Sequence, residues 1–405
     1  MRICMLTFQY PPMFNGGVGT VSSRLARNLA IRGIEIHVVA PGTHRLHERL
    51  SPAFEDGVVV HRTFPALGTY FGDHTELGRI GDYVIGLHRE MDFDLFHALF
   101  LVPAAHVGAV VASESSRPLV VSIHGSDIEL MRYNPVLQGT VRWVLGQAET
   151  VTAVSSDLLD KAHRLADVKS GRVIANAYDP ESFDSESIQE MAVNQGWRHQ
   201  FFVESFQRAK RRGGPVFGTA GMIRPVKGFQ FLLQAFQKLV ASFSNSHMLV
   251  VGDFGVPEEK KAYLNQIKAM GLKRKISITG PVPPRHVMAW LQQMDIFAFP
   301  SLHEGSPNAL MEAMACGLGV VASDVGGIPE IVTDGVDGIL IPPGDGDRLH
   351  EELFCLAEDL GLREKIGGNA RRTIETRFSP TQEAKVWIEL YRAAIGVEDS
   401  LSVST

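Results

Sequence analysis

Two glutamates with seven residues between them form a pair that could do chemistry in this chain. Glu304 precedes a predicted helix, and Glu312 lies about one and a half turns into it. Their carboxylates only accept hydrogen bonds, so they suit hydroxyl groups rather than phosphate. Between them, the N–H groups of Asn308 and Ala309 open the helix at the positive end of its dipole, which suits phosphate. A ligand with hydroxyls on both sides of a diphosphate, such as a nucleoside diphosphate joined to a sugar, fits this pattern.

A strand–helix–strand unit positions this pair. Apolar runs at 296–299 and 319–322 predict two buried strands. Between them, we expect Ser306 as the N-cap, Pro307 as the first helical residue and Gly317 just beyond the helix end. Sheets of α/β proteins bind ligands beyond the carboxyl ends of their strands, which is where the first glutamate lies. The alternative is a surface unit with two ordinary solvent-facing glutamates.

Two further loops in this half of the chain carry candidate ligand contacts. Arg224 and Lys227 follow a predicted strand at 216–219, and two cations at one strand end can neutralise a diphosphate. Each such charge-assisted contact contributes roughly 1.5–3 kcal/mol. Val282 lies in a Gly- and Pro-rich loop after a predicted strand at 276–279, where the backbone could contact the edge of a base. The alternative for the cations is a pair of solvated loop residues.

The first half of the chain has a glycine cluster and a histidine at strand ends. Gly16 and Gly17 follow a predicted strand at 3–7 and allow a ligand to approach the backbone at a helix start. Their spacing is not Gly-x-Gly-x-x-Gly, and no acidic residue closes the next strand, so a nicotinamide cofactor is disfavoured. His124 ends a predicted strand at 119–123, where side chains reach a ligand site. A tight turn and a structural histidine are the alternatives.

Length and composition indicate the class of protein that carries these sites. A chain of 405 residues with 45% hydrophobic and 21% charged residues predicts two α/β domains of a soluble protein. The net charge of −6 does not indicate the positively charged surface that is typical of nucleic-acid-binding proteins. Three widely spaced cysteines fit neither a disulfide framework nor a metal site, which favours a reducing, cytoplasmic compartment. The longest apolar stretch, 95–112, is interrupted by two histidines and a proline and predicts a strand, a loop and a helix start rather than a membrane span.

The region from 179 to 214 differs in character from both halves. An acidic segment is followed by aromatic residues that we expect on one helical face, and then by a basic run at 208–212. The aromatic residues are Trp197, Phe201, Phe202 and Phe206. We expect an interdomain connection whose aromatic face packs between domains. The alternative is that this aromatic face, with the basic run, contacts an anionic membrane surface or the acceptor.

Taken together, these motifs resemble the retaining family 4 glycosyltransferases, also described as glycosyl transferases group 1. The resemblance is most specific over residues 301–317, with the paired glutamates, and over residues 324–330. The other landmarks occur in the family's order and are Pro11-Pro12 with Gly16-Gly17, His124-Gly125-x-Asp127, Asn176 and Lys227-Gly228. The resemblance spans nearly the whole chain.

The resemblance implies a GT-B fold, in which two Rossmann-like β/α/β domains face each other across a cleft and a C-terminal helix crosses back to the first domain. It places an acceptor-binding domain at 1–178, completed by about 381–396. A connection with an insertion follows at 179–214, and a nucleotide-sugar-binding domain at 215–380.

The resemblance also implies roles for residues in the second domain. Glu304 would hold hydroxyls of the donor sugar, and Glu312 would hold the ribose. Lys227 and the N–H groups of Asn308 and Ala309 would hold the diphosphate.

In the first domain, Gly16 and Gly17 would approach the donor, and His124 would contact the sugar near the reacting carbon. With Glu304, His124 is therefore an expected catalytic residue. One departure concerns the family's arginine, which usually stands five positions before the lysine, where this chain has Met222. We expect Arg224 to take over its contact with the diphosphate.

The implied reaction is a retaining transfer of a sugar from a UDP-, GDP- or ADP-linked donor to a hydroxyl of a sugar, a lipid-linked glycan or a small molecule. No cofactor and no metal are expected, and the chain has no Asp-x-Asp pair at the site. A GT-B epimerase acting on a nucleotide sugar and a catalytically silent nucleotide-sugar-binding module are the alternatives. The sequence names neither the sugar, the base, the acceptor nor the oligomeric state.

Overall fold

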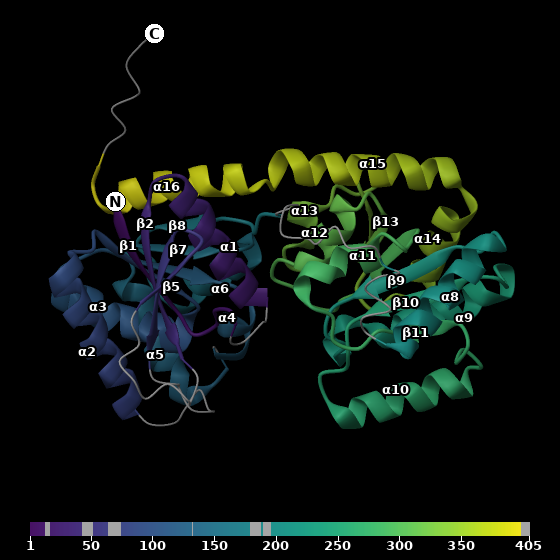
Figure 1. The fold of residues 1–405 in the computed structure, drawn as a ribbon, viewed down its shortest axis with the longest axis horizontal. Helices are drawn as coiled ribbons and strands as arrows, with labels where there is room; N and C mark the ends of the chain where they lie inside the picture. Colours follow the sequence, from purple (N-terminus) through teal and green to yellow (C-terminus); the bar gives the residue numbers. More distant parts are fainter. Residues whose placement is uncertain are drawn as a thin grey trace, which may run out of the picture. The chain divides into compact units, whose positions relative to one another are not determined.

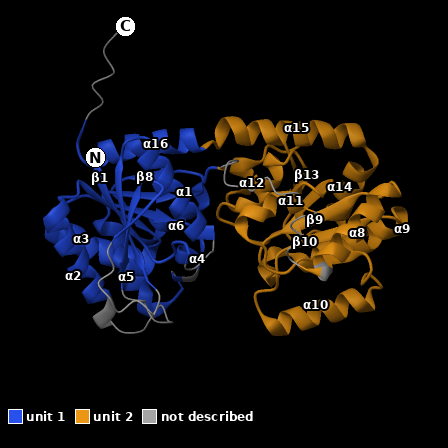
Figure 2. Cartoon of the chain, in the orientation of Figure 1, with its two compact units in different colours: residues 1–177, 380–405 blue, residues 178–379 orange. Residues whose placement is uncertain are grey.

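The computed structural model describes residues 1–12, 17–42, 52–63, 74–131, 133–178, 188 and 196–397. The chain divides into two compact units (Figure 2), one of residues 1–177 with 380–405 and the other of residues 178–379. Each unit is a layered α/β body with its own central sheet (Figure 1).

The first unit has an eight-stranded sheet in the order β3-β4-β2-β1-β5-β6-β7-β8. Neighbouring strands are parallel except for the antiparallel pair β3–β4 at one edge. The strands are β1 (Arg2–Thr7), β2 (Glu35–Pro41), β3 (Ala53–Glu55), β4 (Val58–Thr63), β5 (Leu95–Leu99), β6 (Leu119–Ile123), β7 (Thr150–Ala153) and β8 (Gly171–Val173). The central strands β5 and β6 are buried along their whole length, as expected for a parallel sheet with both faces covered.

Helices connect these strands and cover the sheet. They are α1 (Gly17–Ile31), α2 (His74–Met91), α3 (His106–Ser115), α4 (Ser126–Met131), α5 (Pro135–Gln147), α6 (Ser156–Leu165) and α16 (Pro380–Ala394). A π-helical turn at Leu101–Ala105 joins β5 to α3, so the stretch 95–112 is a strand, a connecting turn and a helix start, as predicted.

The last described helix, α16, belongs to the first unit although it follows the second unit in the sequence. It packs beside α1. Trp387 and Tyr391 from α16 are buried in the same core as Leu25 and Leu29 from α1. The unit is therefore completed by a segment more than 200 residues away from its last strand, which is the return helix that the resemblance implies.

The second unit has a six-stranded, fully parallel sheet in the order β11-β10-β9-β12-β13-β14. The strands are β9 (Val216–Ala220), β10 (His247–Val251), β11 (Ile276–Ile278), β12 (Ile296–Phe299), β13 (Gly319–Ser323) and β14 (Ile339–Ile341). The helices are α8 (Trp197–Arg211), α9 (Phe229–Ser242), α10 (Pro257–Ala269), α11 (Val287–Leu291), α12 (Asn308–Ala315), α13 (Ile328–Ile331), α14 (Gly346–Glu358) and α15 (Leu360–Arg377). The strand order reverses between β9 and β12, and α/β sheets bind ligands where this happens.

Helix α8 packs against β9 and β10 of the second unit. Phe206 is fully buried and its ring lies 6.4 Å from that of Trp290, whereas Phe201 is 58% exposed. The prediction that the aromatic residues share one buried face is therefore wrong for Phe201. Phe202 and Phe206 are four residues apart and share a face, but Phe201 lies about 100° further around the helix. The side chain of Trp197 lies outside the described residues.

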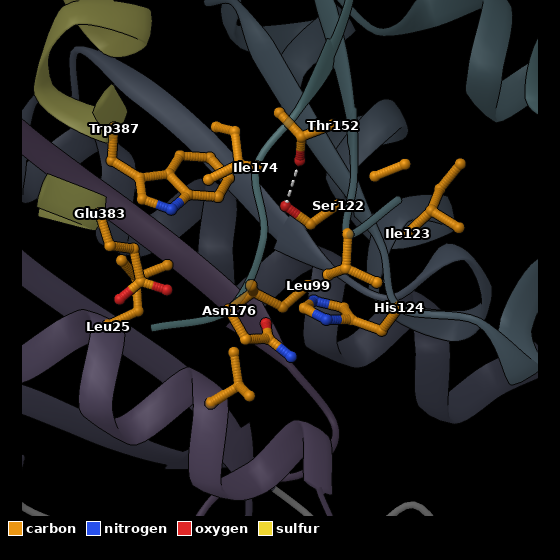
Figure 3. Close-up of a pocket in the computed structure, with 13 residues that line it drawn as sticks. Leu25, Leu99, Ser122, Ile123, His124, Thr152, Ile174, Asn176, Glu383 and Trp387 are labelled. Atoms are coloured by element: carbon orange, nitrogen blue, oxygen red, sulfur yellow. Dashed lines mark hydrogen bonds between the residues drawn. The ribbon is translucent and has the colours of Figure 1, made fainter. Parts of the chain in front are cut away.

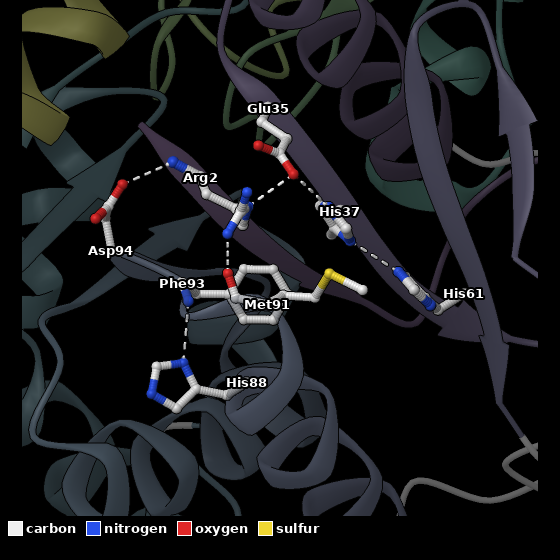
Figure 4. Close-up of polar contacts among 8 residues, drawn as sticks. All are labelled: Arg2, Glu35, His37, His61, His88, Met91, Phe93 and Asp94. Carbon is white, nitrogen blue, oxygen red and sulfur yellow. Dashed lines mark hydrogen bonds and ion pairs between the residues drawn. The ribbon is translucent and has the colours of Figure 1, made fainter.

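A chain of polar contacts crosses the amino end of the first sheet (Figure 4). Arg2 Nε donates to Glu35 Oε1 at 2.7 Å, and this oxygen lies 3.2 Å from His37 Nε2. His37 Nδ1 lies 3.0 Å from His61 Nε2, and His61 Nδ1 lies 3.1 Å from the Tyr83 hydroxyl. Both histidines are buried, so this chain satisfies ring nitrogens that would otherwise destabilise the sheet.

Among the helices that the structure describes, none is both long enough and apolar enough to cross a membrane.

Candidate active site

The strand–helix–strand unit of β12, α12 and β13 forms largely as predicted, but its helix starts one residue later. Pro307 is extended (φ −80°, ψ 101°) and occupies the N-cap position, and its carbonyl accepts from the N–H groups of Leu310 and Met311 at 3.1 and 3.2 Å. The prediction of Ser306 as the N-cap is therefore wrong. Within the described residues, the Oγ atom of Ser306 is buried and has no hydrogen-bond partner. A proline carbonyl can accept the first intrahelical bonds, so no serine side chain is needed there.

The end of this helix is as predicted. Gly317 has φ +73°, and its N–H donates to the Met314 carbonyl at 2.9 Å. The next N–H, from Leu318, donates to the Ala313 carbonyl at 3.3 Å. These two bonds make a Schellman motif, which turns the chain directly into β13.

Asn308 and Ala309 are the first two residues of α12, and both are partly exposed. Glu304 lies in the loop directly before this eight-residue helix, and Glu312 lies about one turn into it. The positive end of the helix dipole and a carboxylate are thus next to each other, as the sequence pattern requires.

The central contact of the site joins Lys227 to Glu304. Lys227 Nζ forms an ion pair with Glu304 Oε1 and lies 5.3 Å from the centre of the Phe299 ring. The side chain of Glu304 is only 9% exposed, while that of Lys227 is 34% exposed. Lys227 follows β9 and Glu304 follows β12, so the pair lies at the reversal of strand order. A carboxylate and an ammonium group are therefore held together where a ligand is expected.

Two glycines hold the backbone around this ion pair. Gly228 has φ +66°, and a Cβ placed there would lie 1.9 Å from the Pro300 carbonyl oxygen. Gly326 has φ +54°, and a Cβ there would lie 1.8 Å from the carbonyl oxygen of Glu304. Leu302 N–H donates to the Val226 carbonyl at 2.8 Å, which joins the loop after β12 to the loop after β9. The loops after β9, β12 and β13 are thus packed backbone to backbone, and side chains would separate them.

Arg224 lies at the same edge of the sheet and is exposed. Its Nε and Nη2 atoms lie 3.2 and 3.0 Å from Met222 Sδ, so the guanidinium folds back onto residue 222. Residue 222 is the position at which the family resemblance expects an arginine. The geometry is compatible with Arg224 replacing that arginine, and its contact with a diphosphate stays a prediction.

Val282 is partly exposed in the loop after β11. The loop is attached to the neighbouring strand end, because Gly280 N–H donates to the Gly252 carbonyl at 3.1 Å. Val282 therefore lies at the same edge of the second sheet as Lys227, two strands further from the reversal point. Its contact with a base stays a prediction.

In the first unit, His124 follows β6 and is held by a buried turn. Asp127 is fully buried and accepts hydrogen bonds from the N–H groups of His124, Gly125 and Ile128 at 3.2, 2.8 and 3.0 Å. Gly125 has φ +126°, which favours glycine. The His-Gly-x-Asp sequence thus encodes a hydrogen-bonded turn that fixes the backbone at the histidine.

The His124 ring lines a small cavity together with Asn176, another predicted landmark (Figure 3). Burial, and to a lesser extent the positive charge of Arg24, lowers the pKa of His124 to about 4. The imidazole is therefore neutral near pH 7 and can both donate and accept a hydrogen bond. Gly17 begins α1 and is exposed, and Gly16 lies outside the described residues.

Solved structures with the same architecture identify the class. The crystal structure of HepE from Anabaena in complex with UDP superposes on this chain with a TM-score of 0.75 and 22% sequence identity. The match covers 97% of this chain and 100% of that chain. Sucrose-phosphate synthase from Thermosynechococcus elongatus gives a TM-score of 0.77 at 16% identity, over 98% of this chain and 100% of that chain. The fold is GT-B, as predicted, with two Rossmann-like units.

Family models then give the family itself. The model for Glycosyltransferase Family 4 matches residues 15–182, and the model for Glycosyl transferases group 1 matches residues 214–359. Together they cover most of the chain. The chain belongs to the family 4 glycosyltransferases and is a transferase of the hexosyltransferase type.

Relatives with assigned activities match more than nine-tenths of the chain. N-acetyl-alpha-D-glucosaminyl L-malate synthase of Bacillus anthracis is 26% identical over 91% of this chain and 91% of its own length. D-inositol 3-phosphate glycosyltransferase 1 of Catenulispora acidiphila is 28% identical over 94% of this chain and 91% of its own length. The predicted glycosyltransferase activity with a nucleotide sugar donor is confirmed at this level.

Proposed function

We propose that this glycosyltransferase moves a sugar from a nucleotide-diphosphate sugar to an acceptor hydroxyl with retention of configuration at the anomeric carbon. The observation that supports this most directly is the Lys227–Glu304 ion pair beside the start of α12. It combines a cation, a helix N-terminus and a carboxylate, which match a leaving diphosphate and the hydroxyls of a sugar.

Each group has a defined task in the proposed reaction. Lys227 and the N–H groups of Asn308 and Ala309 bind the diphosphate, and Glu304 accepts hydrogen bonds from the sugar hydroxyls. Glu312 accepts from the ribose hydroxyls. When the donor binds, the Lys227 ammonium exchanges part of its contact with Glu304 for a phosphate oxygen, which frees Glu304 Oε1 for the sugar. His124 contacts the sugar near the reacting carbon.

No metal ion and no cofactor are part of this proposal. Charge that develops on the leaving diphosphate is stabilised by Lys227, by the start of α12 and by Arg224, which follows the same strand as Lys227. Turnover should therefore be unchanged in excess EDTA. A loss of turnover that returns on adding Mg²⁺ or Mn²⁺ would refute metal independence.

The donor base and the acceptor are proposed only as classes. Crystals of HepE hold UDP and UDP-glucose, and a starch synthase structure holds ADP. We propose a UDP-, GDP- or ADP-linked donor. The relatives named above act on L-malate and on D-inositol 3-phosphate. We propose a hydroxyl of a small molecule, a sugar or a lipid-linked glycan as the acceptor.

Two substitutions test the assigned roles. Glu304→Gln keeps the size of the side chain but removes its charge, so turnover should fall by about a hundredfold or more, with a smaller effect on donor affinity. Lys227→Ala should mainly weaken donor binding, by about tenfold or more. Lys238→Ala is the matched control, because Lys238 also forms an ion pair with a carboxylate, Asp347, but on the surface.

Turnover and product configuration are measured with each candidate donor and followed by NMR of the product. Turnover in Glu304→Gln equal to that of the wild type would reject the role of this glutamate. Inverted product would reject retention. A rearranged sugar released without acceptor would indicate an epimerase, and donor binding without any product would indicate a silent binding module.

We also propose a cytoplasmic location with weak attachment to an anionic membrane surface. Cys4, Cys316 and Cys355 are free thiols, as expected in a reducing compartment. On α8, Phe201 is exposed, and the basic residues at the end of the same helix, Arg208, Lys210 and Arg211, are exposed as well. The protein should pellet with vesicles that contain anionic lipids at low salt but not with neutral vesicles. Failure to pellet with either would reject membrane attachment.

A further inference from the structure

The segment that connects β11 to α11, residues 279–286, carries Val282, at which we expect the base of the donor to bind. Positions 281, 283 and 284 are prolines, which restrict the backbone and have no N–H. Between 281 and 284, Val282 therefore has the sole N–H group. Within the described part of the chain, neither this N–H nor the Val282 carbonyl has a hydrogen-bond partner. One donor and one acceptor on a single residue can pair with the edge of a base.

This segment begins at an edge of the second sheet. The strand before it, β11, has three residues and pairs with β10 on one side, whereas its other side has no strand among the described residues. A short strand with one neighbour makes few hydrogen bonds, so the chain that follows it needs other contacts to stay in place. The contacts at the start of the segment are therefore important for the position of Val282.

Thr279 is the first residue after β11 and is 6% exposed. Its N–H donates to the Val250 carbonyl at 3.0 Å. Its hydroxyl accepts from the Gly252 N–H at 3.0 Å and donates to the Gly280 carbonyl at 2.8 Å. The remaining polar group of Thr279 is its carbonyl, a buried acceptor that needs a donor from outside the sheet.

His199 on α8 supplies this donor. Its Nε2 atom donates to the Thr279 carbonyl at 3.0 Å. Because a carbonyl oxygen only accepts, this contact requires a proton on Nε2. The same ring lies 5.7 Å from the ring of Trp290, a fully buried residue of α11. His199 thus contacts both the residue at which the segment 279–286 begins and the helix into which the segment leads.

His199 lies on the inward-facing side of α8. Phe202 and Phe206 follow it on the same helical face. The ring of Phe202 lies 5.9 Å from that of His199, and Phe206 is fully buried beside Trp290. These contacts limit the movement of the imidazole, so its hydrogen bond fixes the Thr279 carbonyl relative to α8.

We propose that His199 is a positioning residue for recognition of the donor base. Its hydrogen bond to Thr279 and its contact with Trp290 hold the segment 279–286, so that the N–H and C=O groups of Val282 stay in place to bind the base. His199 acts through the backbone and does not itself contact the donor. The inference rests on the proposed function, in which the donor is a nucleotide sugar.

His199→Phe is the main test, because phenylalanine keeps an aromatic ring beside Trp290 but cannot donate to Thr279. Binding of UDP, GDP, ADP and inorganic pyrophosphate is measured by calorimetry. The affinity for the preferred nucleoside diphosphate should fall by about tenfold, the value for one hydrogen bond, while the affinity for pyrophosphate, which has no base, stays unchanged. His199→Gln restores a side-chain N–H donor and should return most of the lost affinity.

Phe206→Leu is the matched control, because it shortens a buried side chain in the same aromatic cluster but leaves His199 and Thr279 unchanged. It should lower Tm, whereas the ratio of nucleoside diphosphate affinity to pyrophosphate affinity should stay that of the wild type. A decrease in this ratio as large as that in His199→Phe would mean that the general packing of α8 sets the ratio, and it would overturn the proposal. A wild-type ratio in His199→Phe would overturn it as well.

The wild-type protein alone can also decide the matter. A crystal structure with the preferred nucleoside diphosphate would refute the inference, even if no variant folded, if the base lay away from Val282 or if His199 Nε2 lay beyond hydrogen-bond distance of the Thr279 carbonyl. If the wild type bound none of UDP, GDP and ADP more tightly than pyrophosphate, the proposed class of donor would fail together with the inference. A base preference that is present in the wild type and kept in His199→Phe would refute the inference alone.

Discussion

Replacing Gly326 by alanine should displace Glu304 and reduce turnover far more than it reduces stability. The glycine has φ +54°, and its added Cβ would lie 1.8 Å from the Glu304 carbonyl oxygen, whereas real Cβ contacts below 3.0 Å essentially do not occur. The two backbones must therefore move apart by more than about 1 Å. A misplacement of this size at a reacting group can lower turnover by about a hundredfold.

Gly335→Ala is the matched control for this substitution. Gly335 has a similar φ of +70°, but an added Cβ would meet nothing within 4 Å. Gly335→Ala should therefore lower the free energy of unfolding only through the strain of a left-handed alanine, by about 1–2 kcal/mol, which corresponds to a decrease of a few degrees in Tm. We expect Gly335→Ala to keep wild-type turnover at this lower Tm, as measured by initial rates and thermal unfolding. If Gly326→Ala also kept wild-type turnover, Glu304 would not depend on the close packing of these two loops.

Three further predictions concern other parts of the chain. Glu312→Ala should weaken binding of the preferred nucleoside diphosphate by about tenfold, as measured by calorimetry. The variant should also distinguish this ligand less well from its 2′-deoxy analogue; an unchanged ratio of the two affinities would reject the ribose contact. Burial, with the nearby His37, lowers the pKa of His61 from 6.5 to about 4, so its contribution to stability is complete above pH 6.5 and is lost as the pH falls toward 4. Between pH 7.5 and 5 this loss in the free energy of unfolding is about 2 kcal/mol. Urea unfolding of His61→Gln should therefore show a decrease between these two pH values that is smaller than the wild-type decrease by that amount; an equal decrease would reject the lowered pKa of His61. Cys316 is partly exposed and burial raises its pKa to about 12, whereas Cys355 is exposed, so a thiol reagent should modify Cys355 faster than Cys316 in the folded protein; equal rates would contradict the raised pKa of Cys316.

Much of the fold could be predicted because parallel strands buried on both faces have a strong sequence signal. The runs at 119–123 and 296–299 coincide with β6 and β12 to the residue, and they are apolar except for Ser122 and have a proline next to one end. Helix ends were less predictable. The end at Gly317 was right because a left-handed C′ position strongly favours glycine, whereas the start was off by one residue because both serine and proline are common there.

The residues around Glu304 could be predicted together because they lie close together in sequence. Glu304 and the start of α12 belong to one loop and one helix, so local spacing places them relative to each other. The pairing of Glu304 with Lys227 was not visible in this way, because the two residues are 77 positions apart. The reversal of strand order between β9 and β12 brings them together, and this reversal appears only once the sheet is assembled.

Glu383 shows where sequence reasoning reached its limit. Helix α16 was predicted with nearly correct ends, but nothing local distinguishes Glu383 from the exposed Glu389 on the same helix. The difference arises because α16 packs on α1, which buries Glu383 next to Arg24, a residue 359 positions earlier in the chain. A buried ion pair of this kind is weak evidence for added stability, because desolvation offsets much of the attraction between the charges. Glu383 Oε1 also accepts from the Ala177 N–H at 3.2 Å, so this residue fixes where α16 lies against the segment that follows β8.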